Sequence, residues 1–531
     1  MSDKLSKLND LIATGNYAKA ELYLYDYLKN NPNDYSINKN LGMTLLAQKK
    51  YEGALKSFEK CYFINNKDVD ILLNLSYLFL RVQDHEQSIK FANEAIKLNS
   101  DLAGAYQNLS VCYLEMKDFD QAEKYANLVI NLRGGLNSEE FLKYSDFIDS
   151  YTDILIATKQ FDKFIKFAQD ILDKEIFDGD LFKKLLNHDR SKIKQKYIDQ
   201  LHYVVDTPGI FKNIIEKNSK SASALICLAE YNKKQKDLSE KYYVEANKHI
   251  ASMQRAPIYA RQKMYLKLTE YFTKFNEEQV TDFISKEKGD GLIFIIGMPR
   301  SGTTLIESIL STADDIVAGG EKVFFTNNLW SIFADLKPGV DIDPKYIDDL
   351  GNRYLDTIAM QRGGARFFID KMPSNFLYYK FINLAFPKAK FIHTFRDPWD
   401  NAISLFKANF QESIVYASSF FAISNEYSNY SFLMNFWKKT PNNNLFDISY
   451  EEVVTNTNDI VGNLWSFCNL QGDYSDVRRK NHYANTASRQ QVSQNIYISS
   501  LKKEEFLEYR DQFHEDLANQ DLFWKKRDFN L

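Results

Sequence analysis

The chain is poor in cysteine, and its cysteines are not arranged for a metal site or a disulfide framework. The four cysteines lie far apart and form no C-x-x-C pair; they are Cys61, Cys112, Cys227 and Cys468. The sequence also contains no H-E-x-x-H motif and no cluster of cysteine and histidine. We therefore expect no metal ion, and a protein of a reducing compartment.

Long apolar runs are lacking as well. The opening residues MSDKLSKLND contain no apolar core of a signal peptide, and the apolar run at 292–296 is far shorter than the roughly 20 residues that cross a bilayer. Neither sign of charge is in excess, because 67 basic residues balance 71 acidic ones. This balance gives no electrostatic reason to expect nucleic acid or a membrane as partner. We expect a cytoplasmic protein.

The chain does have enough apolar material to fold over most of its length. Hydrophobic residues make up 44% and aromatic residues 15% of its 531 residues, as is typical of globular proteins. At roughly 150 residues per domain, this length predicts about three structural units.

The N-terminal part contains an internal repeat with a period of 34 residues. One column of the repeat holds Tyr17, Tyr51, His85 and Phe119. Another holds the small residues Ala20, Ala54, Ser88 and Ala122. Residues that end helices occupy a third column, at Pro32, Asn66 and Ser100. The columns predict successive pairs of packed helices.

These columns resemble the tetratricopeptide repeat, in which a small residue lets the two helices of a pair approach closely. The alternative is a set of unrelated amphipathic helix pairs. Residues 156–172 and 225–250 have helical apolar spacing but drift from the period, so we expect degenerate or capping repeats there. We assign residues 1–136 to the repeats and residues 137–287 to degenerate repeats and connecting helices, with a joining helix at 259–275.

From about residue 288 the pattern changes to short apolar runs, each followed by a loop and then by helical spacing. The runs are LIFIIG, RFFID, KFIHTF and NLFDIS. Such alternation favours a parallel sheet covered by helices. The predicted fold is therefore multidomain: an N-terminal α-solenoid and, over residues 288–531, an α/β P-loop-like domain with a central parallel sheet.

A phosphate-binding loop is predicted after the first of these strands. Glycines at 297 and 302 let the backbone curl around an anion, and the helix that follows offers its free amides and its dipole. The candidate ligands are Pro299, Arg300, Ser301, Gly302, Thr303 and Thr304. The loop has the spacing of a P-loop, but Thr303 stands where a nucleoside triphosphatase has lysine. A nucleotide kinase or triphosphatase is therefore a less favoured alternative function. The alternative without a function is an ordinary glycine turn that binds no phosphate.

The segment FIIGMPRSGTTL resembles the 5′-phosphosulfate loop of the sulfotransferase superfamily, especially its protein-tyrosine sulfotransferase branch and bacterial members with tetratricopeptide repeats. The resemblance covers roughly residues 290–500. It implies transfer of a sulfuryl group from 3′-phosphoadenosine 5′-phosphosulfate (PAPS) to an acceptor hydroxyl. In this branch the acceptor is a tyrosine of a protein or peptide, while glycan and small-molecule hydroxyls remain open.

The resemblance also assigns roles to residues further along the chain. Arg396 and Ser404 match the motif that binds the 3′-phosphate, although Arg396 could instead pair locally with Asp397. Lys371 resembles the catalytic lysine and Glu321 the general base, with Arg300 assisting at the sulfate. Without the resemblance, Lys371 would be a solvated residue at a strand end and Glu321 an ordinary glutamate at a helix start. His393 and His482 are rival bases by chemistry alone.

Near the C-terminus, Ser488 matches a serine of a segment that contacts the nucleotide, but the neighbouring residues match only in part. The repeats are expected to hold a polypeptide acceptor or a partner protein on their concave surface. A non-catalytic repeat scaffold is the non-enzymatic alternative. The sequence gives no oligomeric state.

Overall fold

The computed structural model describes residues 11–12, 14–136, 138, 145–207, 209, 211, 213–253, 258–330, 332–410, 414–439, 444–471 and 504–525. The chain forms two compact units. The first comprises Met1–Gln160 with Leu355–Gln361, and the second comprises Phe161–Tyr354 with Arg362–Leu531. No helix within the described residues has the length and apolar character needed to cross a membrane.

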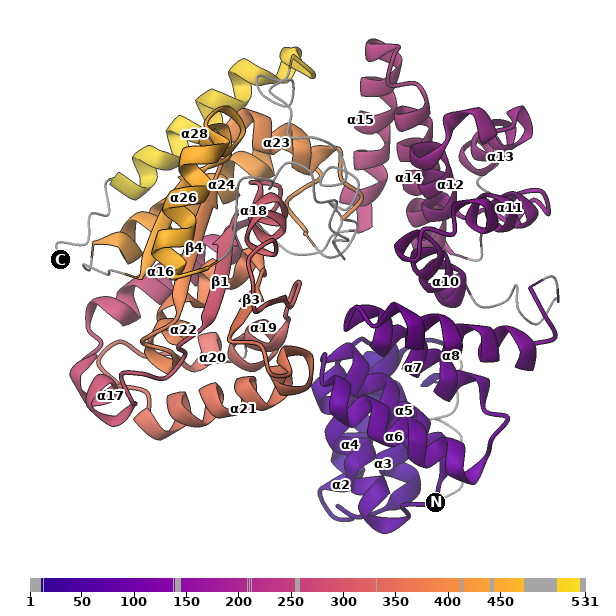
Figure 1. Cartoon of the computed structure of the whole chain (residues 1–531), viewed down its shortest axis with the longest axis horizontal. Helices are drawn as coiled ribbons and strands as arrows, with labels where there is room; N and C mark the ends of the chain where they lie inside the picture. The colour runs from indigo at the N-terminus through magenta and orange to yellow at the C-terminus, as the bar shows by residue number, and fades with distance from the viewer. Residues whose placement is uncertain are drawn as a thin grey trace. The chain divides into compact units, whose positions relative to one another are not determined.

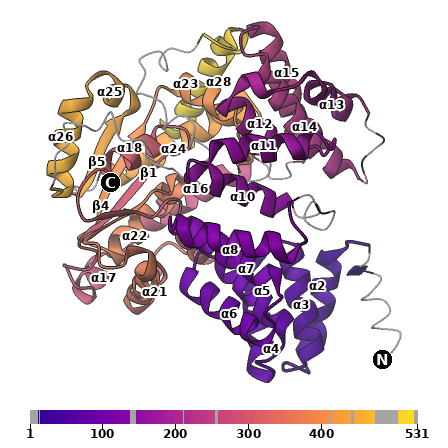
Figure 2. The same cartoon turned by 45° about the vertical axis from the view of Figure 1, so that its right-hand side comes forward.

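The first unit is built of helices that pack against their neighbours in the chain (Figures 1 and 2). They are α2 (Tyr17–Leu28), α3 (Tyr35–Ala47), α4 (Tyr51–Ile64), α5 (Val69–Arg81), α6 (His85–Leu98), α7 (Ala103–Glu115), α8 (Phe119–Leu132) and α10 (Ser145–Ala157). The predicted helical repeat is confirmed: two helices form each period of the repeat.

The small residues of the repeat lie where the helices of a pair touch. Ala54 and Ser88 are fully buried, and a Cβ atom at Gly42 would lie 2.8 Å from the ring of Phe58. Aspartates cap several of the helices at the same repeat spacing. Asp34 and Asp68 accept hydrogen bonds from the first turns of α3 and α5.

The second unit begins with further helices that belong to the same compact body as the sheet. They are α11 (Phe161–Leu172), α12 (Gly179–His188), η1 (Arg190–Lys192), α13 (Gln195–Asp206), α14 (Ile214–Tyr231), α15 (Lys236–Met253), α16 (Ile258–Thr273) and α17 (Glu278–Phe283). Residues 156–172 and 225–250, which have helical apolar spacing, each contain a turn between two helices. The chain turns at Lys159, whose φ of 58° is left-handed, and between α14 and α15.

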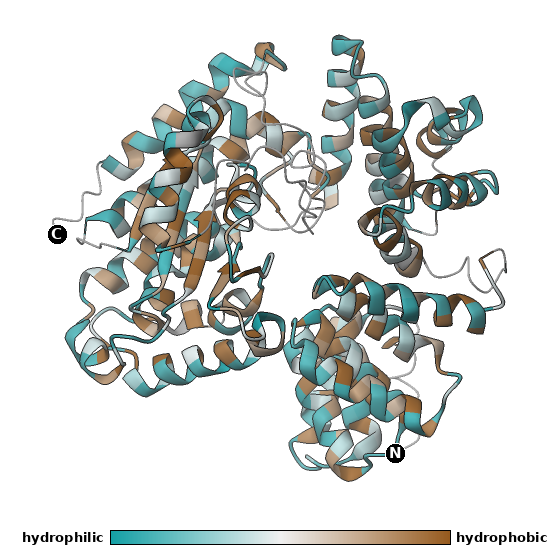
Figure 3. Cartoon of the chain, in the orientation of Figure 1, coloured by the Kyte–Doolittle hydropathy of each residue, from teal (hydrophilic) through white to brown (hydrophobic). Residues whose placement is uncertain are grey.

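A parallel sheet of five strands forms the centre of the second unit, as predicted. Its strands, in the spatial order β2-β3-β1-β4-β5, are β1 (Leu292–Gly297), β2 (Ile316–Ala318), β3 (Phe367–Asp370), β4 (Lys390–Phe395) and β5 (Leu445–Ser449). All four pairings are parallel. Figure 3 shows the central strands as hydrophobic, which agrees with the burial of every residue of β1.

Helices cover both faces of the sheet. Alternate strand residues such as Ile293 and Ile369 pack against α18 (Thr303–Leu310) and α26 (Thr457–Cys468). The opposite face packs through Phe294 against Phe325, Tyr354 and Phe386. The remaining elements are α19 (Phe324–Leu329), α20 (Ile332–Asp335), α21 (Pro344–Arg362), η3 (Pro373–Tyr378), α22 (Tyr379–Ala385), α23 (Pro398–Phe406), α24 (Phe420–Lys438), α25 (Tyr450–Thr455), η5 (Leu507–Tyr509) and α28 (Arg510–Lys525).

A buried ion pair joins α16 to α24. Glu426 is 2% exposed; its carboxylate accepts from Arg261 Nε at 2.7 Å, contacts Arg261 Nη2, and accepts from the Tyr265 hydroxyl at 2.7 Å. Such a pair contributes little net stability over apolar residues, but removing one partner leaves a buried charge without its counterion.

We therefore expect Glu426→Gln to destabilise the second unit by roughly 3–5 kcal/mol. The measurement is urea unfolding followed by tryptophan fluorescence. The control is Glu245→Gln, which removes an exposed pair with Lys248 and is expected to change stability by less than about 1 kcal/mol. Equal losses in the two variants would contradict the importance of burial at Glu426.

Candidate functional site

The sequence-predicted residues gather at one edge of the sheet. Because all five strands are parallel, their carboxyl ends lie together. The loop with Arg300 follows β1, Glu321 follows β2, Lys371 follows β3 and Arg396 follows β4. Ligands of open α/β sheets bind outside the carboxyl ends, where the direction of the strand order reverses. In this sheet the reversal occurs at β1, whose neighbours are β3 and β4.

The loop after β1 is curled by left-handed residues and ends at the first turn of α18. Gly297, Arg300 and Gly302 have φ values of 149°, 70° and 101°. A Cβ atom at Gly297 would lie 2.2 Å from the carbonyl oxygen of Thr394, and one at Gly302 would lie 2.6 Å from Tyr450 Cδ2. Close approach and backbone conformation therefore both require glycine at these two positions.

Neighbouring elements fix the loop. The Ser301 hydroxyl lies 2.7 Å from the Thr394 hydroxyl, and Asn401 Nδ2 donates to the Pro299 carbonyl at 3.0 Å. Ser301 thus holds the loop through its side chain. Thr303 and Thr304 form the first turn of α18, where the helix dipole favours an anion.

Two arginines lie close together in this region. Burial, followed by the nearby charge of Arg396, lowers the pKa of the Arg300 guanidinium to about 10, while the charges of Glu321 and Tyr450 act in the opposite direction. Arg396 is buried and Arg300 is partly buried, and an anion between two guanidinium groups that repel each other would stabilise both. This is the arrangement expected of a site for phosphate or sulfate groups.

Arg396 and Ser404 contact each other, since Arg396 Nη1 lies 3.4 Å from the Ser404 hydroxyl. The Arg396 guanidinium also stacks 4.3 Å from the ring centre of Tyr450 and lies 3.8 Å from Asp400. Asp397 caps α23 by accepting from the Asp400 N–H at 2.9 Å, and Pro398 begins the helix. The Asp397 side chain therefore serves as the N-cap of α23.

Glu321 and Lys371 contact each other at the ends of β2 and β3. Lys371 Nζ donates to Glu321 Oε1. The lysine side chain is 0% exposed, whereas that of the glutamate is 43% exposed. A partly exposed carboxylate thus forms an ion pair with a buried ammonium group, near the loop that contains Arg300.

The comparisons with known proteins agree with this geometry. Residues 293–476 match the model of the sulfotransferase family, and residues 37–68, 69–102 and 103–134 match that of the tetratricopeptide repeat. Residues 293–476 therefore match a sulfotransferase-family domain. The predicted combination of repeats with a sulfotransferase domain is therefore confirmed.

Several relatives share part of this chain. An uncharacterized protein of Aquifex aeolicus is 26% identical over 59% of this chain and 42% of that protein. Protein-tyrosine sulfotransferase 1 of Homo sapiens is 30% identical over 20% of this chain and 31% of that protein. The chain thus spans less than half of the length of these relatives. The sulfotransferase domain of the Synechococcus PCC 7002 olefin synthase is 15% identical, with coverage of 45% of this chain and 96% of that one and a TM-score of 0.31.

His393, a rival base, is buried in the sulfotransferase domain. Its Nδ1 atom lies 2.6 Å from Asp447 Oδ1 and its Nε2 atom contacts the Tyr430 hydroxyl. Burial lowers the pKa of His393. Because both ring nitrogens have protein partners, we assign His393 a structural role. His482 and Ser488 lie outside the described residues.

The side chains that support the loops around Arg300 and Arg396 were not predicted from the sequence. From α24, the Tyr427 hydroxyl donates to the Arg396 carbonyl at 2.6 Å, and the hydroxyl of Tyr430 accepts from the Met298 N–H. Tyr450, beside Gly302 and Arg396, was also missed. It directly follows β5, so the rule that strand ends carry function could have found it. No local signal marks Tyr427 or Tyr430.

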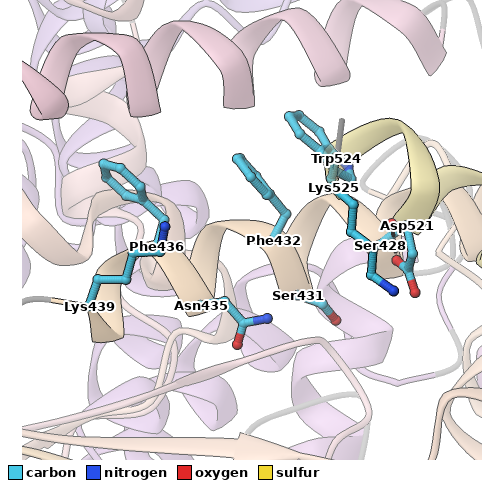
Figure 4. Close-up of a pocket in the computed structure, with 9 residues that line it drawn as sticks. All are labelled: Ser428, Ser431, Phe432, Asn435, Phe436, Lys439, Asp521, Trp524 and Lys525. Carbon is cyan, nitrogen blue, oxygen red and sulfur yellow. Dashed lines mark hydrogen bonds between the residues drawn. The ribbon is translucent and has the colours of Figure 1, made fainter. Parts of the chain in front are cut away.

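A cavity of about 270 Å³ lies elsewhere, between α24 and α28 (Figure 4). Its wall includes Phe432 and Trp524, whose rings stack at 3.9 Å, and the side chains of Lys439 and Lys525. It contains none of the residues predicted for the site. Among the described residues, no three His, Cys, Asp or Glu side chains are grouped so that they could hold a metal ion.

Proposed function

We propose that this chain transfers a sulfuryl group from PAPS to an acceptor hydroxyl. The observation that supports this most is the Glu321–Lys371 pair at the sheet edge that also carries Arg300 and Arg396. A base, a buried cation and two arginines for anionic groups are what this reaction requires. Family membership of residues 293–476 supports the same reaction type.

Two parts of the site support this donor. The loop after β1 and the first turn of α18 suit the 5′-phosphosulfate, because the amides at the start of a helix and the Arg300 guanidinium would both attract an anion. Arg396, Ser404 and Tyr450 suit the 3′-phosphate, since arginine offers a permanently charged and forked donor. The donor itself supplies an activated bond between sulfur and a phosphate oxygen.

Glu321, Lys371 and Arg300 have different roles in the proposed reaction. Glu321 takes the proton of the acceptor hydroxyl as the acceptor oxygen bonds to sulfur. The bond from sulfur to the bridging phosphate oxygen breaks, and Lys371 and Arg300 stabilise the negative charge that develops on that oxygen. The Glu321 carboxylate is half-exposed, so an acceptor can approach it from solvent. The buried Lys371 ammonium group holds this carboxylate in place.

The direct test of the reaction is incubation with ³⁵S-labelled PAPS and a cell extract, followed by identification of the labelled species. We expect a labelled polypeptide whose label lies on tyrosine. A labelled glycan or small molecule would contradict the polypeptide acceptor but not the sulfuryl transfer, and no labelled species at all would contradict both.

We further propose that the repeats bind a polypeptide acceptor, since stacked helix pairs build an extended surface. The test compares KM for the intact acceptor with KM for a short peptide that contains the same tyrosine. We expect a clearly lower KM for the intact polypeptide. Equal KM values would show that the repeats do not present the acceptor.

Arg396→Ala is expected to weaken binding of adenosine 3′,5′-bisphosphate about 10- to 100-fold, because a hydrogen bond to a charged group contributes roughly 1.5–3 kcal/mol. Isothermal titration calorimetry measures this. The matched control is Arg366→Ala, an exposed arginine at the opposite end of β3. Unchanged affinity in Arg396→Ala would overturn the assignment of the 3′-phosphate site.

A further inference from the structure

Two further side chains of opposite charge, Lys322 and Asp370, are buried near Glu321 and Lys371, and we call them the inner pair. Each of the neighbouring strands β2 and β3 ends near an acidic residue followed by a lysine: Glu321-Lys322 and Asp370-Lys371. Glu321 contacts Lys371. The backbone N–H of Lys322 donates to the Asp370 carboxylate, and the charge of Lys322 acts on it. Lys322 and Asp370 are 3% and 1% exposed, so this inner pair is buried.

Helix α21 contacts the inner pair through Tyr354. The Tyr354 hydroxyl donates to Asp370 Oδ2 at 2.9 Å. Tyr354 is fully buried and its ring lies 4.8 Å from that of Phe325 and 5.8 Å from that of Phe294. Because burial and the Asp370 charge raise the pKa of Tyr354 well above its usual range, the phenol remains a proton donor.

The segment that carries Glu321 is fixed to β3 and to α18. Lys371 N donates to the Gly320 carbonyl at 2.9 Å, and Gly319 N donates to the Ile369 carbonyl at 2.7 Å. From α18, Glu307 Oε1 accepts from the Gly320 N–H at 3.1 Å. Asp370 and Glu307 thus hold the backbone amides on either side of Glu321.

We propose that Asp370, which accepts from the Tyr354 hydroxyl and from the Lys322 backbone N–H, is a positioning residue that keeps Glu321 and Lys371 aligned for proton removal. This proposal rests on the proposed function. If Asp370 loses its charge, the buried Lys322 ammonium loses a nearby negative charge and attracts the adjacent Glu321. Glu321 would then take a different position relative to Lys371.

The proposal predicts a pH dependence. Burial raises the pKa of Asp370 to about 7; the Tyr354 hydrogen bond and Lys322 lower it, and Glu307 raises it. Lys371 and Glu321, followed by Arg300 and Arg396, are further charged groups at this sheet edge. Asp370 is therefore neutral on the acid side of about pH 7, where we expect turnover to decline. Removal of the Tyr354 hydroxyl removes a contact that lowers the pKa, so the decline should begin at higher pH.

The experiment uses the full chain and compares wild type, Tyr354→Phe and Asp370→Asn. Infrared spectroscopy follows the carbonyl band of a protonated carboxyl group through neutral pH. We expect one such band to titrate near pH 7 in wild type, to titrate about half to one pH unit higher in Tyr354→Phe, and to be absent in Asp370→Asn. The acid limb of kcat for a tyrosine-containing peptide should shift with the band, while KM for PAPS stays unchanged.

The control is Tyr271→Phe, which removes another buried hydroxyl that accepts from the Ile342 N–H, away from the sheet edge. It should leave the band and the pH profile unchanged. A wild-type profile in Tyr354→Phe would overturn the positioning role, as would a wild-type infrared titration in that variant. Failure of the wild-type chain to bind adenosine 3′,5′-bisphosphate would instead overturn the proposed function.

Discussion

Glu321→Gln is expected to lower kcat by roughly 10²–10⁴-fold, because loss of a general base removes the acceptor of the hydroxyl proton. The amide retains the size of the carboxylate, and Glu321 is not among the groups assigned to the phosphates. Affinity for adenosine 3′,5′-bisphosphate should therefore stay within a few fold of wild type. Steady-state kinetics with labelled PAPS and calorimetry measure the two quantities.

The matched control for this variant is Glu287→Gln, an exposed glutamate paired with Lys388 in the same unit. It should leave kcat unchanged. Full activity of Glu321→Gln would remove Glu321 from the role of base. Equal losses in kcat and in nucleotide affinity would indicate that Glu321 shapes the donor site instead.

Lys371→Met should lower kcat by roughly 10²–10³-fold, the loss seen when one group that stabilises developing negative charge is removed. The methionine fills the space of the lysine stem in a fully buried position. Its control is Lys388→Met, a half-exposed lysine for which no loss is expected.

The double variant Glu321→Gln with Lys371→Met separates joint from independent action. Residues that act as a unit are strongly non-additive, so the double variant should lose little more than the worse single one. Glu287→Gln with Lys388→Met should show additive, near-zero effects, since exposed ion pairs couple weakly. Additive losses in the first cycle would show that Glu321 and Lys371 work separately.

The sequence predicted those parts of the site that depend on short stretches of chain. The loop around Arg300 follows a buried strand and opens a helix, so spacing and residue type were sufficient to place it. The cap at Asp397 and the position of Ser404 in α23 likewise follow from a few neighbouring residues. The repeat was recognisable because its columns recur at a fixed period.

What the sequence could not predict depends on the order of strands in the sheet. Glu321 and Lys371 meet because β2 pairs with β3, a choice between several possible neighbours that no single strand reveals. The same pairing brings Lys322 to Asp370. The hydrogen bond from Tyr427 to Arg396 depends on where α24 packs. Helix α24 is buried on most sides and partly polar, so its sequence shows no clear apolar stripe that would indicate which element it packs against.

The turns within 156–172 and 225–250 show a further limit. Both segments keep helical apolar spacing on each side of the turn, so the spacing predicted helices without giving the position of the turn between them. Lys159 has a left-handed backbone conformation but is not a glycine, so its residue type does not predict the turn. Helices α14 and α15 also belong to the same unit as the sheet: Asn247 Nδ2 donates to the Phe406 carbonyl at the end of α23, 2.8 Å away. Such long-range contacts leave no trace in local spacing.

Calorimetry on the full chain with two ligands distinguishes a donor site for PAPS from a site for a nucleoside triphosphate. Adenosine 3′,5′-bisphosphate should bind clearly more tightly than ATP with Mg²⁺, because Arg396 and Ser404 suit a 3′-phosphate and Thr303 replaces the lysine that holds a γ-phosphate. Tighter binding of ATP with Mg²⁺ than of adenosine 3′,5′-bisphosphate would contradict it.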